Sequence, residues 1–203
     1  IAADGSTVVK VYYKRKTVNV TFNPNGGTIS GSTANVTRSG RFGAVLTPPS
    51  PVKTGYHLNP SGEWNPVSSA PALGSSPYTF PTANGTYQAN WAPNTYKVEF
   101  NNNGGSGSMP DQQFTYGTAQ YLQSNTFTKT GHDFLGWSKN SGATTATYNN
   151  QASVNNLTTT NGDIVNLYAV WKLKTYKVRF CVEGGKGSLT ASGQTASDST
   201  LKE

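Results

Sequence analysis

Cysteine, acidic residues and histidine are all scarce in this sequence. Cys181 is the only cysteine, so no disulfide can form within the chain and no metal site can be built from paired thiolates. The 203 residues include nine acidic residues and two histidines. The acidic residues are dispersed one by one, which leaves few pairs of carboxylates for acid–base chemistry.

The few histidines and carboxylates do not indicate a catalytic or metal site. A hydrolytic triad needs a nucleophile, a base and an orienting acid, but His57 and His132 fall at non-equivalent positions of the repeat described below. The Asn-rich turns at 23–25 and 101–103 carry no carboxylate, whereas Ca²⁺ needs several. We therefore expect no enzyme activity, no metal site and no cofactor.

Long apolar runs are also missing. No run reaches the roughly 18 residues that a transmembrane helix needs, and residues 1–4 lack the basic and apolar regions of a signal peptide. A segment taken from the middle of a longer secreted or surface protein would explain both features.

Residues that favour strands dominate what is present. Leu, Glu, Met and Arg, which favour helices, are sparse, while Thr, Val and aromatic residues are plentiful, with 11 Tyr, 8 Phe and 4 Trp. Short strands joined by many turns suit this balance, so we expect a mainly β protein.

A repeat of about 80 residues organises the chain. An alternating strand pattern begins at Thr17, Thr95 and Thr175, so the offsets are 78 and 80 residues (95 − 17 and 175 − 95). Each pattern leads into a Gly pair: Gly26-Gly27, Gly104-Gly105 and Gly184-Gly185. The near-constant spacing predicts tandem units.

A second alternating run precedes each opening pattern and ends in a large aromatic residue, Tyr13, Trp91 or Trp171. Alternation places apolar side chains on one face, as a strand with one buried face requires. Three residues separate each closing run from the next opening run, which predicts a semi-rigid series of units. The predicted parts are the last strand of a preceding repeat (1–16), a divergent first unit (17–94), a second unit (95–174) and the start of a truncated third unit (175–203).

The opening strand of the first unit is expected to bury Val18, Val20 and Phe22. Asn and Gly tolerate positive φ, so the following Asn-Gly-Gly segments predict tight turns. The return strands of the resulting hairpins are predicted at 34–37 in the first unit and at 113–116 in the second.

Large aromatic side chains are the expected anchors of such small cores. The anchors predicted in the core are Trp91, Trp137 and Trp171. Trp64 is the expected counterpart of Trp137 after an insertion around 59–62. Val154 and Leu157 stand three residues apart, which fits a single helical turn packed on the sheet.

The second unit closely resembles the internalin-type B-repeat, also called the Listeria-Bacteroides repeat. The resemblance rests on residues 96–100, 103–105, 131–137 and 167–171. It implies tandem small β-grasp-like, ubiquitin-related units with at most a short helical turn each. It also implies an extracellular, secreted or wall-attached bacterial protein with spacer or adhesive functions, and it brings no catalytic residues. The implied partners are a host surface receptor, an extracellular glycan or the bacterium's own wall polymers.

Basic residues gather at the junctions between the predicted units. The chain carries a net charge of +7, which favours polyanions such as a sulfated glycan or teichoic acid. The candidate polyanion-binding residues are Lys14, Arg15, Lys16, Lys172, Lys174, Lys177 and Arg179. Ordinary solvated linkers are the alternative interpretation. We expect no nucleic-acid partner, because no nucleic-acid-binding motif accompanies these residues.

Trp64 and Tyr78 are the candidates for stacking on a sugar. Trp64 lies beside a polar insertion, so core packing and glycan stacking both remain open for it. A dedicated glycan-binding domain is accordingly the alternative to a spacer and adhesion module.

Overall fold

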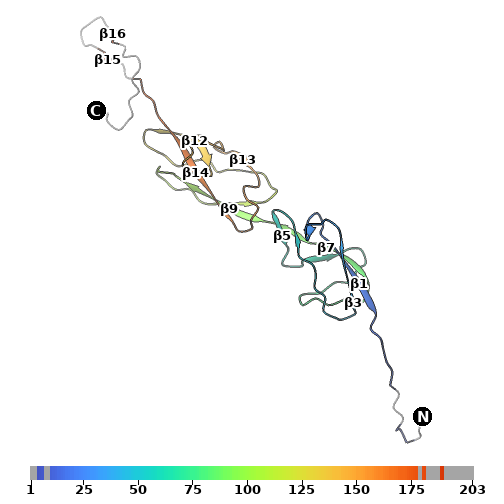
Figure 1. Ribbon diagram of the computed structural model, residues 1–203. Helices are drawn as coiled ribbons and strands as arrows, with labels where there is room; N and C mark the ends of the chain where they lie inside the picture. Colours follow the sequence, from blue (N-terminus) through green and yellow to red (C-terminus); the bar gives the residue numbers. More distant parts are fainter. Residues whose placement is uncertain (1–3, 7–9, 178–179, 182–187, 190–203) are drawn as a thin grey trace. The chain divides into compact units, whose positions relative to one another are not determined.

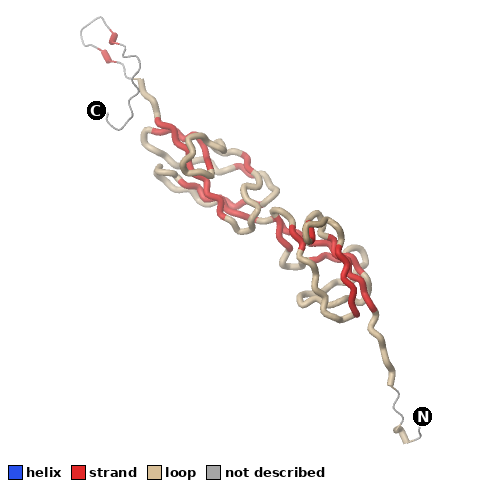
Figure 2. Tube along the Cα trace, viewed as in Figure 1, coloured by secondary structure: helices blue, strands red, loops and turns tan. Residues whose placement is uncertain are grey.

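Regular structure in this protein consists of strands. The computed structural model describes residues 4–6, 10–177, 180–181 and 188–189, and every regular element among them is a β-strand (Figure 2). The chain divides into two compact units, Ile1–Pro93 and Asn94–Glu203. The mainly β class predicted from the sequence is confirmed.

A four-stranded mixed sheet forms the centre of the first unit (Figure 1). Its order is β3-β1-β7-β6, and β1 runs antiparallel to β3 and parallel to β7. In that order the strands span Val36–Arg41, Thr17–Asn23, Gly85–Ala89 and Trp64–Pro66. Two shorter antiparallel pairs are β2 (Thr28–Ile29) with β4 (Pro51–Val52), and β5 (Tyr56–Leu58) with β8 (Trp91–Pro93).

The second unit repeats this strand order. Its sheet runs β10-β9-β14-β12, and β9 is antiparallel to β10 and parallel to β14. In that order the strands span Gln112–Thr115, Thr95–Asn101, Ile164–Leu173 and His132–Ser138. Shorter pairs are β11 (Gln120–Tyr121) with β13 (Ser153–Val154), and β15 (Phe180–Cys181) with β16 (Ser188–Leu189). The β-grasp-like assignment of these units stays a prediction.

The parallel pairing of opening and closing strands explains why both carry alternating apolar residues. Val18, Val20 and Phe22 of β1 are buried as predicted, and Tyr87 and Ala89 of β7 join the same core. The second core is built from the equivalent strands. Its fully buried side chains include Tyr96, Val98, Phe114, Leu122, Trp137, Leu167 and Ala169, with Phe100 half-buried against them. Each unit therefore has its own core.

The predicted Asn-Gly-Gly turns form in both units. The Gly27 N–H donates to the Pro24 carbonyl at 3.0 Å, and the two residues between them have φ of 49° (Asn25) and 78° (Gly26). Two consecutive positive φ values are typical of a type I′ turn, which is common in hairpins because its twist matches that of the flanking strands. The simple hairpin is nevertheless wrong in detail, since the turn leads into β2, which pairs with β4, and the return strand β3 follows later.

Two side-chain hydrogen bonds connect this turn to residues 89–91 at the end of the closing run. The Asn25 side-chain amide donates to the Ala89 carbonyl at 2.9 Å, and the Trp91 indole N–H donates to the Pro24 carbonyl at 3.0 Å. The same contacts recur in the second unit, from Asn103 to Ala169 at 2.9 Å and from Trp171 to Asn102 at 2.8 Å. Trp91 and Trp171 are half-buried and pack against the two cores, and Trp137 is fully buried, so all three contribute to the cores as predicted.

The predicted helical turn at 154–157 does not form. Ser153 and Val154 pair with β11, and the Leu157 N–H donates to the Tyr96 hydroxyl at 3.2 Å. Val154 is buried in β13 and Leu157 is half-buried after Asn156, whose φ is 54°, so both apolar residues reach the core without a helical turn. Spacing of three residues did not distinguish these two geometries.

The alternating runs at the two ends of the chain do not form the predicted strands among the described residues. Residues 10–16 have no regular structure, and Val11 and Tyr13 are 63% and 90% exposed. Residues 174–177 are also outside any strand, and Tyr176 is 41% exposed. Residues 7–9 and 178–179 lie outside the described part of the chain. In the two complete units a closing strand pairs with an opening strand 65 residues earlier (85 − 20) or 67 residues earlier (164 − 97) along the chain.

Candidate functional site

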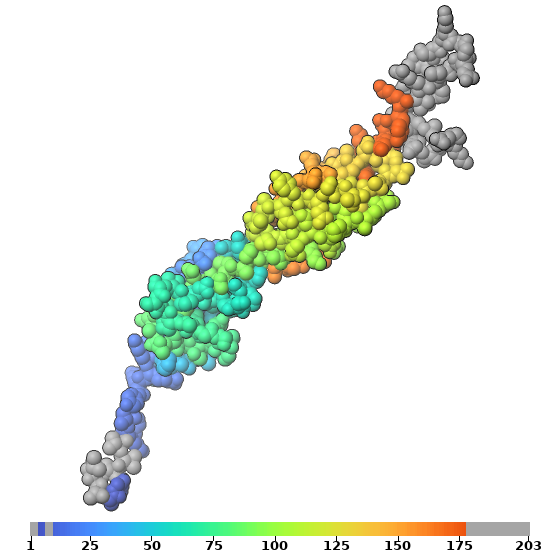
Figure 3. Space-filling view, turned by 180° about the vertical axis from the view of Figure 1, so that it is seen from behind, coloured from blue at the N-terminus to red at the C-terminus, as the bar shows by residue number. Residues whose placement is uncertain are grey.

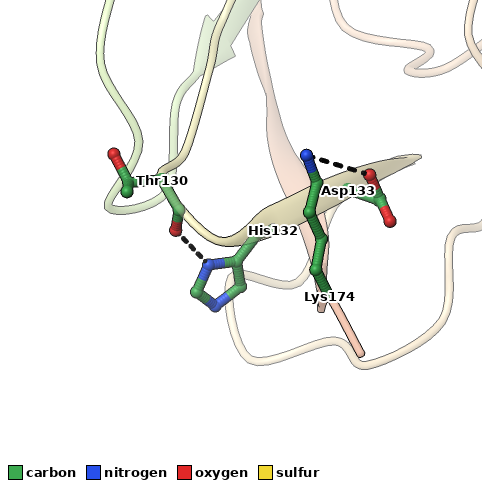
Figure 4. A network of polar contacts seen from close by, with 4 residues as sticks. All are labelled: Thr130, His132, Asp133 and Lys174. Carbon is green, nitrogen blue, oxygen red and sulfur yellow. Dashed lines mark hydrogen bonds and ion pairs between the residues drawn. The ribbon is translucent and has the colours of Figure 1, made fainter. Parts of the chain in front are cut away.

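The two histidines lie on separate strands and in separate units. His57 is in β5 of the first unit, and His132 begins β12 of the second. The His132 Nδ1 lies 2.7 Å from the Thr130 carbonyl oxygen, within a network of polar contacts at the start of that strand (Figure 4). Within the described ranges, no three His, Cys, Asp or Glu residues are grouped so that they could hold a metal ion.

The basic residues at the end of the second unit are partly neutralised by a carboxylate. The Lys174 ammonium lies 3.7 Å from an Asp133 carboxylate oxygen (Figure 4), and Asp133 is the register partner of Lys172. Lys177 is exposed, and Arg179 lies outside the described residues. A nearby carboxylate weakens attraction to a polyanion, so this junction is less cationic than its sequence suggests.

The basic residues at the start of the first unit have a different environment. Residues 10–16 stand away from the folded body of the unit (Figure 3), but Arg15 reaches back to donate from Nη1 to the Phe42 carbonyl at 3.3 Å. The Phe42 N–H in turn donates to the Lys16 carbonyl at 3.0 Å. These bonds bring the segment beside Arg41, which ends β3 opposite Thr17.

We call Lys14, Arg15, Lys16 and Arg41 the first basic surface; all four are exposed. Sequence reasoning missed Arg41, because the return strand was predicted to end at residue 37 and in fact continues to Arg41. Two ion pairs between described residues, Lys97–Asp111 and Lys174–Asp133, lie in the second unit.

The first unit holds most of the net charge of the chain. It carries seven basic residues against two acidic residues, so +5 of the formal +7 belongs to residues 1–93. The basic residues are Lys10, Lys14, Arg15, Lys16, Arg38, Arg41 and Lys53, and the acidic residues are Asp4 and Glu63. Long-range attraction of polyanions is therefore concentrated on this unit.

Trp64 packs in the core, which is one of the two interpretations that the sequence left open for it. Its side chain is 6% exposed, and its ring centroid lies 4.7 Å from that of Phe22 in an edge-to-face contact. The equivalent contact in the second unit joins Trp137 and Phe100 at 4.8 Å. Trp64 thus has the same structural role as Trp137 and offers no ring face to a ligand.

Tyr78 is half-buried against the core and lines an open pocket of about 370 Å³ in the first unit. Its hydroxyl donates to a Glu63 carboxylate oxygen at 3.3 Å. Burial raises the pKa of Tyr78, and the charge of Glu63 and this hydrogen bond raise it further. The tyrosine therefore stays a neutral hydrogen-bond donor beside the carboxylate.

Comparison with known proteins agrees with the repeated sheet order. The family model of the Listeria-Bacteroides repeat domain matches twice in tandem, at residues 19–90 and 96–170. A relative from Evansella cellulosilytica, named "Putative membrane protein", is 35% identical over 104 residues, which cover 51% of this chain and 14% of that protein. Among the described residues, the structure has no helix long and apolar enough to cross a membrane. The chain belongs to the Listeria-Bacteroides repeat domain family.

Proposed function

We propose that this chain is a non-catalytic, semi-rigid spacer and adhesion segment of an extracellular bacterial protein, either secreted or attached to the cell wall. The family membership and the "Putative membrane protein" relative support a bacterial surface setting. The observation that carries the spacer role is the connection between the units. β8 ends at Pro93 and β9 begins at Thr95, so Asn94 is the single residue between two strands.

Both sides of this connection are held within their own units. Pro93 pairs with Tyr56 in the first unit. Asn94 is 5% exposed; its side-chain amide donates to the Thr159 carbonyl at 2.6 Å, and its own carbonyl accepts from the Tyr116 N–H at 2.8 Å. A connection without a free residue leaves few backbone torsions to absorb motion between units, unlike a flexible linker.

Spin-label distance measurements test the spacer role. Nitroxides at Val52→Cys and Tyr121→Cys, which replace side chains 64% and 70% exposed, report the distance between the units once Cys181 is changed to Ser. We expect a narrow distance distribution. The matched control carries a short Gly-Ser insertion after Pro93 and should broaden it. A native distribution as broad as that of the control would contradict a semi-rigid connection.

A second candidate function is the binding of a polyanion, a sulfated glycan or teichoic acid, by the first basic surface. Its support is the exposure of all four cations on a unit of net charge +5. Such binding should weaken steeply with salt, because the Debye length is only about 8 Å at 150 mM.

Heparin and teichoic acid columns test this second function. We expect elution above roughly 150 mM salt, the physiological ionic strength, and earlier elution after Arg15 and Arg41 are both changed to Gln. The matched control changes Lys172 and Lys174 to Gln, which removes the same charge near a carboxylate and should shift elution less. Elution of the native chain at or below 150 mM, or equal shifts in both variants, would refute a dedicated surface.

A further inference from the structure

The pocket beside Tyr78 lies in the first unit and is lined by several prolines. Its walls come from residues 45–51 and 76–78, with Leu58 and Glu63 completing them. Ten of the eleven prolines in the chain belong to the first unit, and the second unit has only Pro110. The prolines that line the pocket are therefore specific to the first unit.

Prolines make up a large part of the walls of this pocket. Pro48, Pro49, Pro51 and Pro77 line it, and proline has no N–H to donate. The Leu46 N–H, another lining group, is already used, since it donates to the Tyr78 carbonyl at 2.9 Å. The remaining polar groups in the walls include the hydroxyls of Thr47, Ser50 and Ser76, which can donate or accept hydrogen bonds.

A strong acceptor, the Glu63 carboxylate, also lines this pocket. Glu63 is one of two acidic residues in the first unit, and the other, Asp4, lies outside the sheet and hydrogen-bonds to Ser6. An ionised carboxylate offers about four acceptor positions, and the Tyr78 hydroxyl uses one of them. Acceptor capacity remains for a ligand that donates hydrogen bonds.

The charge and the apolar surfaces narrow the ligand class further. A carboxylate repels anions, and the net charge of +5 on the unit repels cations at long range. Tyr78, the four prolines and Val45, which is 74% exposed, supply apolar surface beside the carboxylate. A neutral molecule with many hydroxyl donors and an apolar face meets all of these conditions.

We propose that this pocket binds a neutral saccharide. The Glu63 carboxylate accepts hydrogen bonds from sugar hydroxyls, and the Tyr78 ring packs against the C–H face of the sugar ring. The volume of about 370 Å³ falls at the lower end of small-molecule sites, which suits one or two sugar units. This site is independent of the spacer and of the first basic surface, so either of those proposals can fail without affecting it.

Saturation-transfer NMR on the full chain, with a panel of neutral oligosaccharides of glucose, mannose, galactose and N-acetylglucosamine, tests the proposal. We expect at least one member to bind, and we expect Glu63→Gln to weaken its affinity at least tenfold by removing the negative acceptor. Tyr78→Ala should weaken it similarly. Because Tyr78 also packs on the core, Glu63→Gln keeps the test valid if Tyr78→Ala unfolds the unit.

The matched control is Tyr121→Ala, which removes an aromatic side chain 70% exposed on the second unit and should leave binding unchanged. Heparin serves as the anionic probe. Absence of binding by every neutral oligosaccharide would overturn the proposal, as would unchanged affinity in Glu63→Gln. Binding of heparin that depends on Glu63 would also overturn it, because the carboxylate should exclude anions.

Discussion

Trp137 is the residue whose removal tests the packing of the second unit most severely. Its side chain is fully buried, and its ring centroid lies 4.8, 5.0 and 6.0 Å from those of Phe100, Phe134 and Phe127. Trp→Ala in a core typically costs about 3–5 kcal/mol. The Trp137 indole N–H has no acceptor, and loss of an unsatisfied buried donor returns about 1 kcal/mol or more.

The net expectation for Trp137→Ala is a loss of about 2–4 kcal/mol in the free energy of unfolding of the second unit. A unit of about 80 residues has a total of roughly 4–12 kcal/mol, so the variant should be barely stable. With a urea slope of about 1 kcal/mol/M, the midpoint should fall by roughly 2 M or more. The first core contains no residue of the second unit and should be unaffected.

Amide NMR spectra through a urea titration report the two units separately. Tyr121→Ala, at a side chain 70% exposed in the same unit, is the control and should change stability by about 0.5 kcal/mol or less. A shift of the urea midpoint below about 0.5 M for Trp137→Ala would refute the expected loss in the free energy of unfolding. Simultaneous loss of signals from the Val18 and Phe22 region would refute the separation of the cores.

Two further predictions concern the turn and the pH dependence of stability. In Gly105→Ala the new Cβ would lie 2.6 Å from the Thr128 carbonyl oxygen, so we expect thermal unfolding to show a free energy of unfolding lower by about 1–3 kcal/mol. Gly142→Ala is the control and should be nearly neutral, because its nearest neighbour lies at 3.6 Å. Burial raises the pKa values of Tyr78 and Tyr87 above the ordinary 10.0, so the folded state keeps protons that the unfolded state loses. The contribution of these two tyrosines to the free energy of unfolding should be fully present below pH 10.0 and should fall as the pH rises above that value. A free energy of unfolding that increased above pH 10.0 would contradict this expectation.

The strands that alternate and have partners within the chain could be predicted from the sequence. The opening strands start where the pattern placed them, because alternation and a following Asn-Gly turn describe a half-buried strand well. The same alternation did not give strands at 10–13 and at 175–177, since a strand also needs a neighbour to satisfy its backbone groups. The parallel pairing of β1 with β7 was not predictable from local pattern, which carries no information on partners.

Some residues of the candidate sites could likewise be predicted from the sequence, and others could not. Lys14, Arg15 and Lys16 are adjacent in the sequence, and their cluster could be predicted. Arg41 joins them only through strand pairing, and Glu63 and Tyr78 meet only because the chain folds between them. The concentration of prolines in the first unit was the available signal for the pocket, but composition does not show which carboxylate faces it.

Separate production of residues 17–93 and 94–174 tests the central claim, that each repeat is a sheet folded around its own parallel pair of opening and closing strands. Each piece should give a dispersed amide NMR spectrum and a cooperative thermal transition. The slowest hydrogen exchange should fall in β1 and β7 of the first piece and in β9 and β14 of the second, because these strands lie inside each sheet. Pieces that fold only when joined, or exchange protection located outside these strands, would contradict the account.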